Sequence, residues 1–544
     1  MVSVYFSAFY NFIFTNFFHI VKTLEKFQLN IHSKRMASTD IYVDNMTDEQ
    51  LAQAVKDSLN VAAAEEEKQQ NNTTSKTSTT TMHANVKINH QMAFTDGTCQ
   101  LSAIDIASLG RSVSMCWFYT QTLDPDTLLA SLAKTLITFP ILSGRYNGTK
   151  PPTHVNLNNM GIPTDICLWN DTTQTSTNVS SYCSKNVASS FSMWQHVPFV
   201  PIKDGMDPDK MKAEEALFKV KIITFPAGGT SIGILAQHGV VDAESIIDFM
   251  TQWSRIHTNL GLDPIPNHDR CSIVDALDSG EVAYGDANNP PELHWNMQNV
   301  PVGENIMPAF APCMPKIMGD AKLARSCIVP LTKDVCQAWK EAANEGLSEN
   351  QFVSTDDVLT ARIWQGLCEM RCKQLDIATD NETILTTCNR ACNFRKRTEP
   401  PLGKGYCGNA TTSICTTMTI KQLLSSKPSI IALQLRTDLH AVTSLHFAAR
   451  VKWLKARHQE KANPTTIWDK NAMTFIVSSW NFAWEQVNFT GDDSGTPFCY
   501  DHGCLVPVTA VLVPRAKQDG MNVYVSGPDD LCLKHFEDRV NVVG

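Results

Sequence analysis

Residues 217–249, LFKVKIITFPAGGTSIGILAQHGVVDAESIIDF, combine an alternating hairpin, a histidine and an amphipathic segment. From Leu217 to Phe225 apolar side chains alternate with lysines, as expected for a strand with one buried face. The glycines of 227–229 supply a turn, and a second strand from Ser231 to Gln237 leads into His238. Apolar residues then recur at helical spacing. The stretch therefore predicts strand, turn, strand and helix, with the histidine at the strand-to-helix corner.

That corner carries an H-x-x-x-D pattern, from His238 to Asp242. An imidazole, with an ordinary pKa near about 6.5, can take a proton from a hydroxyl or amine and return it to a leaving group. The pattern also arises by chance, with His238 as a hydrogen-bonded core histidine and Asp242 as the N-cap of the helix. The surrounding sequence has to decide between these interpretations.

Four further blocks resemble, in content and order, those of the BAHD acyltransferases, a CoA-dependent family of plants, fungi and algae. They are FPILSGRY at 139–146, STDDVLTARIW at 354–364, NFRKR to GYCGNA at 393–410, and SSW at 478–480. Together with the H-x-x-x-D segment, the resemblance covers roughly residues 85–540. Two positions depart from the family pattern. Residues 488–492 read NFTGD where the family has D-F-G-W-G, and Ala243 stands where glycine is commoner.

The resemblance implies an α/β fold of two similar chloramphenicol-acetyltransferase-like domains. Each is a mixed sheet flanked by helices, and the active-site channel runs between them. We expect the N-terminal acyltransferase domain at 85–285, a crossover at 286–317, and the C-terminal domain at 318–544.

By the same resemblance, the protein moves an acyl group from acyl-CoA to a hydroxyl or amine of a small acceptor in secondary metabolism. His238 is the expected general base, and the indole N–H of Trp480 would stabilise the tetrahedral oxyanion. Trp480 can equally be a core tryptophan. Asp242 is expected to hold the corner by pairing with an arginine, for which Arg325 and Arg362 are the candidates.

No permanently bound cofactor is expected, because acyl-CoA is a co-substrate of the family. The resemblance places coenzyme A contacts near Ser354, Thr355, Arg395, Gly408 and Asn409. These assignments are less specific than that of His238, since exposed serine, threonine and arginine side chains often only face solvent.

Two other functions stay open. One is a carrier-protein-dependent condensation-type synthase, although such domains usually have a second histidine where Gln237 stands. The other is a catalytically silent ubiquitin-binding relative, which the intact His238 opposes and the degenerate 488–492 block leaves open.

Composition narrows the classes of partner. The net charge of -9, without a basic tract, argues against nucleic acid. The 17 cysteines lack a disulfide framework and predict thiols in the cytoplasm. Pairs at 368/372 and 388/392 are one residue too wide for a zinc knuckle, so we expect no metal site. We expect a monomer.

Three segments precede the acyltransferase. Residues 1–35 begin with 21 residues free of charged side chains and rich in aromatics, so they are either a membrane anchor or a mis-assigned start before Met36. Residues 45–68 resemble a ubiquitin-interacting motif, a helix on which Leu51, Ala54 and Ser58 would contact ubiquitin. The polar stretch 69–84 is predicted to be a disordered linker.

Overall fold

The computed structural model describes residues 39–41, 81–87, 97–149, 151–169, 179, 191–192, 214–270, 293–300, 325–460, 463–467, 473–502, 509–527 and 530–541. The chain divides into two compact units, Met1–Asp40 and Ile41–Gly544. In the first unit, only the start of β1 (Thr39–Ile41) is described. The expected anchor at 1–35 and the ubiquitin-interacting helix at 45–68 lie outside the described residues.

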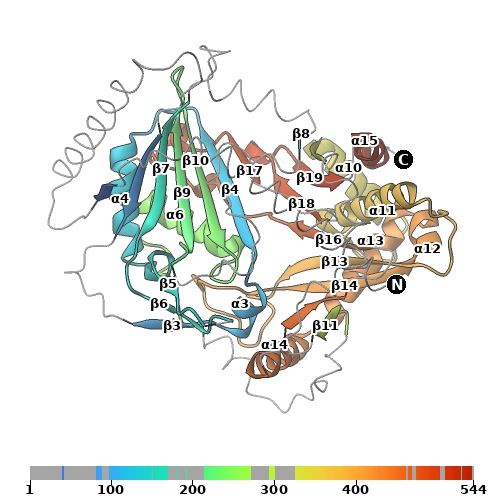
Figure 1. The fold of residues 1–544 in the computed structure, drawn as a ribbon. Coiled ribbons are helices and arrows are strands. Elements are labelled where there is room, and N and C mark those ends of the chain that lie inside the picture. Colours follow the sequence, from blue (N-terminus) through green and yellow to red (C-terminus); the bar gives the residue numbers. More distant parts are fainter. Residues whose placement is uncertain are drawn as a thin grey trace, which may run out of the picture. The chain divides into compact units, whose positions relative to one another are not determined.

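The opening stretch forms the centre of a mixed sheet (Figure 1). From β2 onward its strand order is β2-β7-β9-β10-β4-β17, in which only β7 and β9 pair in parallel. The bounds are β2 (Thr81–Val86), β4 (Ser112–Tyr119), β7 (Ile162–Leu168), β9 (Phe218–Thr224), β10 (Thr230–Gln237) and β17 (Cys499–His502). A small sheet has the order β3-β6-β5, formed by β3 (Thr98–Gln100), β5 (Arg145–Tyr146) and β6 (His154–Asn156).

A second mixed sheet has the order β14-β13-β16-β18-β19-β12-β8 (Figure 1). Its strand β16 is parallel to both of its neighbours, β13 and β18. The bounds are β8 (Phe191–Ser192), β12 (Arg325–Leu331), β13 (Leu385–Asn393), β14 (Thr411–Thr419), β16 (Thr474–Ser479), β18 (Thr509–Pro514) and β19 (Met521–Gly527). The expected crossover at 286–317 contains β11 (Met297–Val300), which pairs with β15 (Asn463–Thr466).

Helices cover both sheets and bury two large apolar cores. Helices α4 (Pro125–Leu136) and α6 (Ala243–His257) pack together on the first sheet. The second core draws on α10 (Lys333–Asn344), α11 (Thr355–Leu375), α12 (Ile420–Ser425), α13 (Pro428–Ala441) and α15 (Asp530–Asn541). A third core joins α3 (Ala103–Ala107) from the first half to α14 (Ser444–Gln459) from the second. The remaining helical turns are η1 (Pro140–Ser143), η3 (Trp484–Gln486), η4 (Asp493–Gly495) and η5 (Ala516–Gln518).

The two halves exchange strands. β17 comes from the C-terminal half of the chain but pairs with β4 of the first sheet, and β8 comes from the N-terminal half but pairs with β12 of the second. The side chain of Phe489, in the block that departs from the family pattern, is buried against Tyr119 and Trp253 in the first core. The predicted α/β class with two mixed sheets is therefore confirmed, but 318–544 is not one spatial domain, because 480–502 packs on the first core.

The expected linker ends earlier than predicted. β2 begins at Thr81, and its residues pair with β7 from Thr81 opposite Cys167 to Val86 opposite Ile162. Ala84 and Val86 are buried, so this stretch belongs to the sheet and not to the linker. The short alternation of apolar and polar residues after the polar tract indicates a strand, so the predicted linker extended too far.

Other findings bear on the sequence predictions. Within the described ranges, no helix is both long and apolar enough to cross a membrane. No group of metal-ligating side chains gathers among the described residues. Thirteen cysteines lie in the described ranges, and no disulfide joins them. Cys368 and Cys372 are buried on α11, and Cys388 and Cys392 are buried on β13.

We predict that a chain beginning at Met82 folds, whereas a chain beginning at Lys87 aggregates. The first truncation keeps nearly all of β2, while the second exposes the edge of β7 and removes Met82, Ala84 and Val86 from the core. Soluble yield and size-exclusion profiles of the two truncations are the measurement. Equal solubility would show that β2 is dispensable.

Candidate active site

The hairpin β9–β10 delivers His238 to the corner in the way the sequence predicts. β10 lies between β9 and β4, with Ile232 opposite both Ile222 and Trp117. Beyond the strand end, the backbone N–H of His238 donates to the carbonyl of Arg111 at 2.8 Å. The corner is tight, because a Cβ on Gly239 would lie 2.6 Å from Leu109 and 2.8 Å from the hydroxyl of Tyr146. A side chain at 239 would therefore require Leu109 and Tyr146 to shift.

Asp242 closes the corner by capping α6. Its carboxylate accepts from the backbone N–H of Ser245 at 3.0 Å, which satisfies a free donor of the first helical turn. It also accepts from the backbone N–H of Ala410 at 3.0 Å and from the hydroxyl of Thr411 at 3.1 Å. One carboxylate thus joins α6 of the first half to the start of β14 in the second.

Arg395 is the cationic partner of Asp242. Both terminal guanidinium nitrogens lie 2.8 Å from the carboxylate oxygens, a bidentate pair in which Asp242 is 2% and Arg395 6% exposed. The guanidinium also donates to the Ser245 hydroxyl and to the carbonyl of Gly408, each at 2.9 Å. The candidates Arg325 and Arg362 were therefore wrong. Arg362 instead stacks over the ring of Trp339.

The surroundings of Asp242 favour its charged form. Burial alone would raise the pKa of a carboxyl, but the charge of Arg395 and hydrogen bonds from Arg395, Ala410 and Ser245 outweigh it and hold the pKa at about 2. Asp242 is therefore ionised at neutral pH. Its contacts go to helix α6 and to the second half, and the imidazole of His238 has a different partner.

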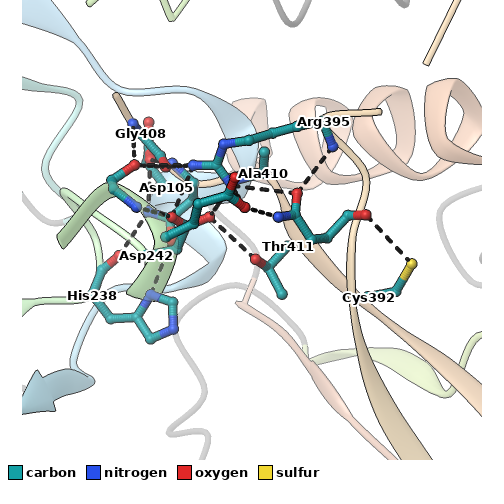
Figure 2. Close-up of polar contacts among 12 residues, drawn as sticks. Asp105, His238, Asp242, Cys392, Arg395, Gly408, Ala410 and Thr411 are labelled. Carbon is teal, nitrogen blue, oxygen red and sulfur yellow. Dashed lines mark hydrogen bonds and ion pairs between the residues drawn. The ribbon is translucent and has the colours of Figure 1, made fainter. Parts of the chain in front are cut away.

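That partner is Asn409. The Nδ1 atom of His238 lies 2.9 Å from Oδ1 of Asn409, while Nδ2 of the same amide donates to the His238 carbonyl at 2.7 Å and to a carboxylate oxygen of Asp105 at 2.7 Å. The amide oxygen only accepts, so the network assigns the imidazole proton to Nδ1. The other ring nitrogen, Nε2, is left with its lone pair. Figure 2 shows it directed away from the cluster.

The environment of His238 keeps the ring neutral. Burial lowers the pKa of His238 below its usual value, and the positive charge of Arg111 lowers it further, against smaller opposing contributions from Asp242 and Asn409. A neutral imidazole with a free Nε2 is the form of a general base at neutral pH.

Three residues predicted to contact coenzyme A belong to this corner instead. The guanidinium of Arg395 bonds to Asp242, and the side-chain amide of Asn409 bonds to Asp105. Gly408 bonds through its backbone N–H and carbonyl to the hydroxyl of Ser245. Asn409 is fully buried. These positions fix the histidine, so their assignment as direct coenzyme A contacts is corrected.

Ser354 and Thr355 lie elsewhere, at the N-terminus of α11. The hydroxyl of Ser354 donates to the carboxylate of Asp357 at 2.7 Å and accepts from the backbone N–H of that residue, which is a capping box. Thr355 is partly exposed. The sequence prediction that this helix end contacts coenzyme A stays a prediction.

Trp480 is 8% exposed and belongs to the first core. Its indole N–H donates to the hydroxyl of Ser478 at 3.0 Å. The ring centroids of Trp480 and His502 lie 4.5 Å apart. The oxyanion role of Trp480 also stays a prediction, and it requires the indole to exchange Ser478 for the substrate oxygen.

Sequence reasoning missed Asp105, Arg270 and Ser245. Asp105 ends the S-x-x-D capping box that opens α3 at Ser102, a pattern visible in the sequence but one that marks helix ends everywhere. Its link to Asn409 spans 304 positions in the chain. No local pattern encodes such a contact.

A histidine at a capped strand-to-helix corner, in a fold of two mixed sheets, is the arrangement that the resemblance to the acyltransferases implies. The chain belongs to the Transferase family, which matches residues 77–539 and comprises the BAHD acyltransferases that the motifs resemble. The predicted family and enzyme class, an acyl-CoA-dependent O- or N-acyltransferase, are thereby confirmed.

Individual relatives are distant. Anthranilate N-benzoyltransferase protein 3 of Dianthus caryophyllus is 23% identical over 59% of this chain and 68% of its own length. Stemmadenine O-acetyltransferase of Catharanthus roseus is 25% identical over 58% of this chain and 65% of its own. Shikimate O-hydroxycinnamoyltransferase of Nicotiana tabacum is 26% identical over 40% and 43%. The matched part thus spans between about two fifths and two thirds of these relatives.

Solved structures confirm the fold over more of the chain. Vinorine synthase aligns with 83% of this chain and 95% of its own, with a TM-score of 0.56 and 17% identity. TRI101 of F. graminearum, complexed with coenzyme A and T-2 mycotoxin, aligns with 80% and 96%, with a TM-score of 0.63 and 17% identity.

Replacing Asp242 with Asn should destabilise the protein by about 3 to 5 kcal/mol, because it leaves the buried Arg395 without its counter-charge. The carboxyl has a folded pKa of about 2 against about 3.9 when unfolded, so its contribution is present above about pH 4 and is lost as the pH falls toward 2. The difference in unfolding free energy between the two proteins should narrow over that range. Urea denaturation at several pH values measures it. Normal stability with abolished turnover would assign Asp242 a direct chemical role.

Proposed function

We propose that this protein transfers an acyl group from acyl-CoA to a hydroxyl or amine of a small-molecule acceptor in secondary metabolism, with His238 as general base. The observation that carries the proposal is the imidazole of His238, whose Nδ1 is held by Oδ1 of Asn409 and whose Nε2 has no hydrogen-bond partner among the described residues. Membership of an acyltransferase family supplies the reaction class.

The chemistry follows from that geometry. Nε2 takes the acceptor proton as the acceptor oxygen or nitrogen bonds to the thioester carbon, which gives a tetrahedral oxyanion. When the oxyanion collapses, the carbon–sulfur bond breaks and Nε2 returns the proton to the coenzyme A thiolate. Trp480 is our candidate donor to the oxyanion, a contribution worth about 3 kcal/mol in comparable sites.

Acceptor and acyl group stay open, because the relatives include both N- and O-acyltransferases. A carrier-protein-dependent synthase is the alternative, which Gln237 in place of a second histidine disfavours. We propose a monomeric cytoplasmic enzyme, in keeping with the thiol state of the described cysteines. A membrane anchor in 1–35 rests on the sequence alone.

Replacing His238 with Ala should lower turnover by about 100- to 10,000-fold, because the base is removed while the contacts of acyl-CoA remain. The unmodified enzyme should lose activity only below about pH 6.5, since the pKa of His238 is lowered. Purified protein incubated with a panel of free acyl-CoAs and acceptor extracts, followed by coenzyme A release and product mass, is the assay. Turnover in the variant within a few-fold of the unmodified enzyme would discard this mechanism, and a strict requirement for a carrier protein would favour the synthase.

We further propose weak ubiquitin binding by residues 45–68, on the helical spacing of Leu51, Ala54 and Ser58 between acidic flanks. A peptide of this segment should shift resonances of labelled ubiquitin only weakly, because a short helix buries little area and loses entropy on ordering. The Ala54→Arg peptide is the matched control and should not bind. Absence of any shift with the unaltered peptide at millimolar concentration would reduce the segment to a spacer.

A further inference from the structure

The orientation of one amide decides whether His238 can act as a base. An asparagine presents an acceptor at one end of its amide and a donor at the other. With Oδ1 of Asn409 at 2.9 Å from Nδ1, the ring must donate from Nδ1 and keep the lone pair of Nε2. A flipped amide would offer its NH₂ group to Nδ1 and favour the tautomer with the proton on Nε2, which cannot accept a proton from substrate.

Two acceptors hold the amide in the productive orientation. Nδ2 of Asn409 donates to the His238 carbonyl and to Oδ1 of Asp105, each at 2.7 Å. The backbone N–H of Asn409 donates to the same Asp105 oxygen at 3.1 Å. A carbonyl offers no proton, and neither does a carboxylate oxygen that already accepts two N–H bonds, so a flip would place the amide oxygen against two acceptors.

Asp105 is itself immobilised by its other oxygen. Oδ2 accepts from the backbone N–H and the hydroxyl of Ser102 at 2.9 and 2.8 Å, and it forms an ion pair with the buried Arg270 at 2.8 Å. The carboxylate is fully buried, and its helix α3 packs on α14 through the third core. One oxygen is thus anchored in the fold, and the other is directed at Asn409.

We propose that Asp105, with Arg270 as its counter-ion, is a positioning residue that sets the tautomer and orientation of His238 through the amide of Asn409. This inference rests on the proposed function, since the tautomer matters only if the ring is the base. The intervening amide has a specific advantage. A carboxylate in direct contact would raise the pKa of the imidazole, whereas the amide orients the ring without placing a negative charge beside it, and the pKa of His238 is lowered.

The chain offers a matched control at Asp357. This residue is also a fully buried aspartate at the third position of a helix, capped by a serine (Ser354) and paired with the arginines Arg390 and Arg436. It differs from Asp105 in its partners, which come from the start of α11, from β13 and from α13 and include neither His238 nor Asn409. Replacement by asparagine at either position removes one buried charge from a capping box.

The test compares Asp105→Asn with Asp357→Asn. An asparagine at 105 can present its own NH₂ group to Asn409 and so permits the flip. We expect kcat to fall by about 100-fold or more, within the range of general-base contributions, with the KM for acyl-CoA changed by less than about threefold. Asp357→Asn should lower the unfolding temperature comparably and leave kcat within about threefold, because a coenzyme A contact of its partner Ser354 would change the KM for acyl-CoA and not kcat. Equal kcat values in the two variants would overturn the proposal.

A double variant separates positioning from general loss of stability. Asn409→Ala removes the link, so adding Asp105→Asn to it should lower kcat by no more than about threefold further, because both act through one imidazole. Multiplication of the two single losses would overturn the proposal. If Asp105→Asn gives no soluble protein, Asp105→Glu replaces it. That variant keeps the charge but shifts the carboxylate by one methylene, and an unchanged kcat would be contradictory.

The outcomes also distinguish this inference from the proposed function. An unmodified protein without turnover on any acyl-CoA rejects the proposed function and the inference with it. Turnover that His238→Ala abolishes and Asp105→Asn leaves intact rejects the positioning role alone.

Discussion

The ion pair between Asp242 and Arg395 is the interaction on which the site depends. It joins the cap of α6, in the first half of the chain, to the segment that leads into β14 in the second. The same segment bonds to Asp242 through Ala410 and, one residue earlier, places Asn409 against His238. The histidine is thus delivered by one half and oriented by the other. Any change that separates the two halves at this point must therefore also release the imidazole.

Burying such a pair is costly, and a buried pair alone is weak evidence for stability. At this corner hydrogen bonds offset the cost. The backbone N–H groups of Ser245 and Ala410 and the hydroxyl of Thr411 donate to the carboxylate, and the carbonyl of Gly408 accepts from the guanidinium. The depressed pKa of Asp242 reflects the same contacts. We infer that the pair is retained for the geometry it imposes on the corner. It also fixes Asn409, the residue before Ala410, which contacts His238.

The sequence was sufficient wherever the determinants are local. The alternation of 217–225, the glycine turn and the helical spacing after Asp242 predict β9, β10 and α6 nearly to the residue. The position of His238 at the strand-to-helix corner was predicted from the junction of β10 and α6. The family blocks predicted the α/β class with two mixed sheets, and the comparisons confirm the family.

Contacts between distant parts of the chain could not be predicted from the sequence. The arginine that pairs with Asp242 lies 153 positions away, and the family resemblance places that residue, Arg395, near coenzyme A instead. The exchange of β17 and β8 between sheets cannot be predicted from strand propensity, which is the same in either sheet. The most direct test of the account is the protonation state of the His238 ring, measured by nitrogen-15 NMR on protein labelled at histidine and assigned by comparison with His238→Gln. The account predicts a neutral ring at pH 7 with a protonated Nδ1 and an unprotonated Nε2, whereas a proton on Nε2 would contradict it.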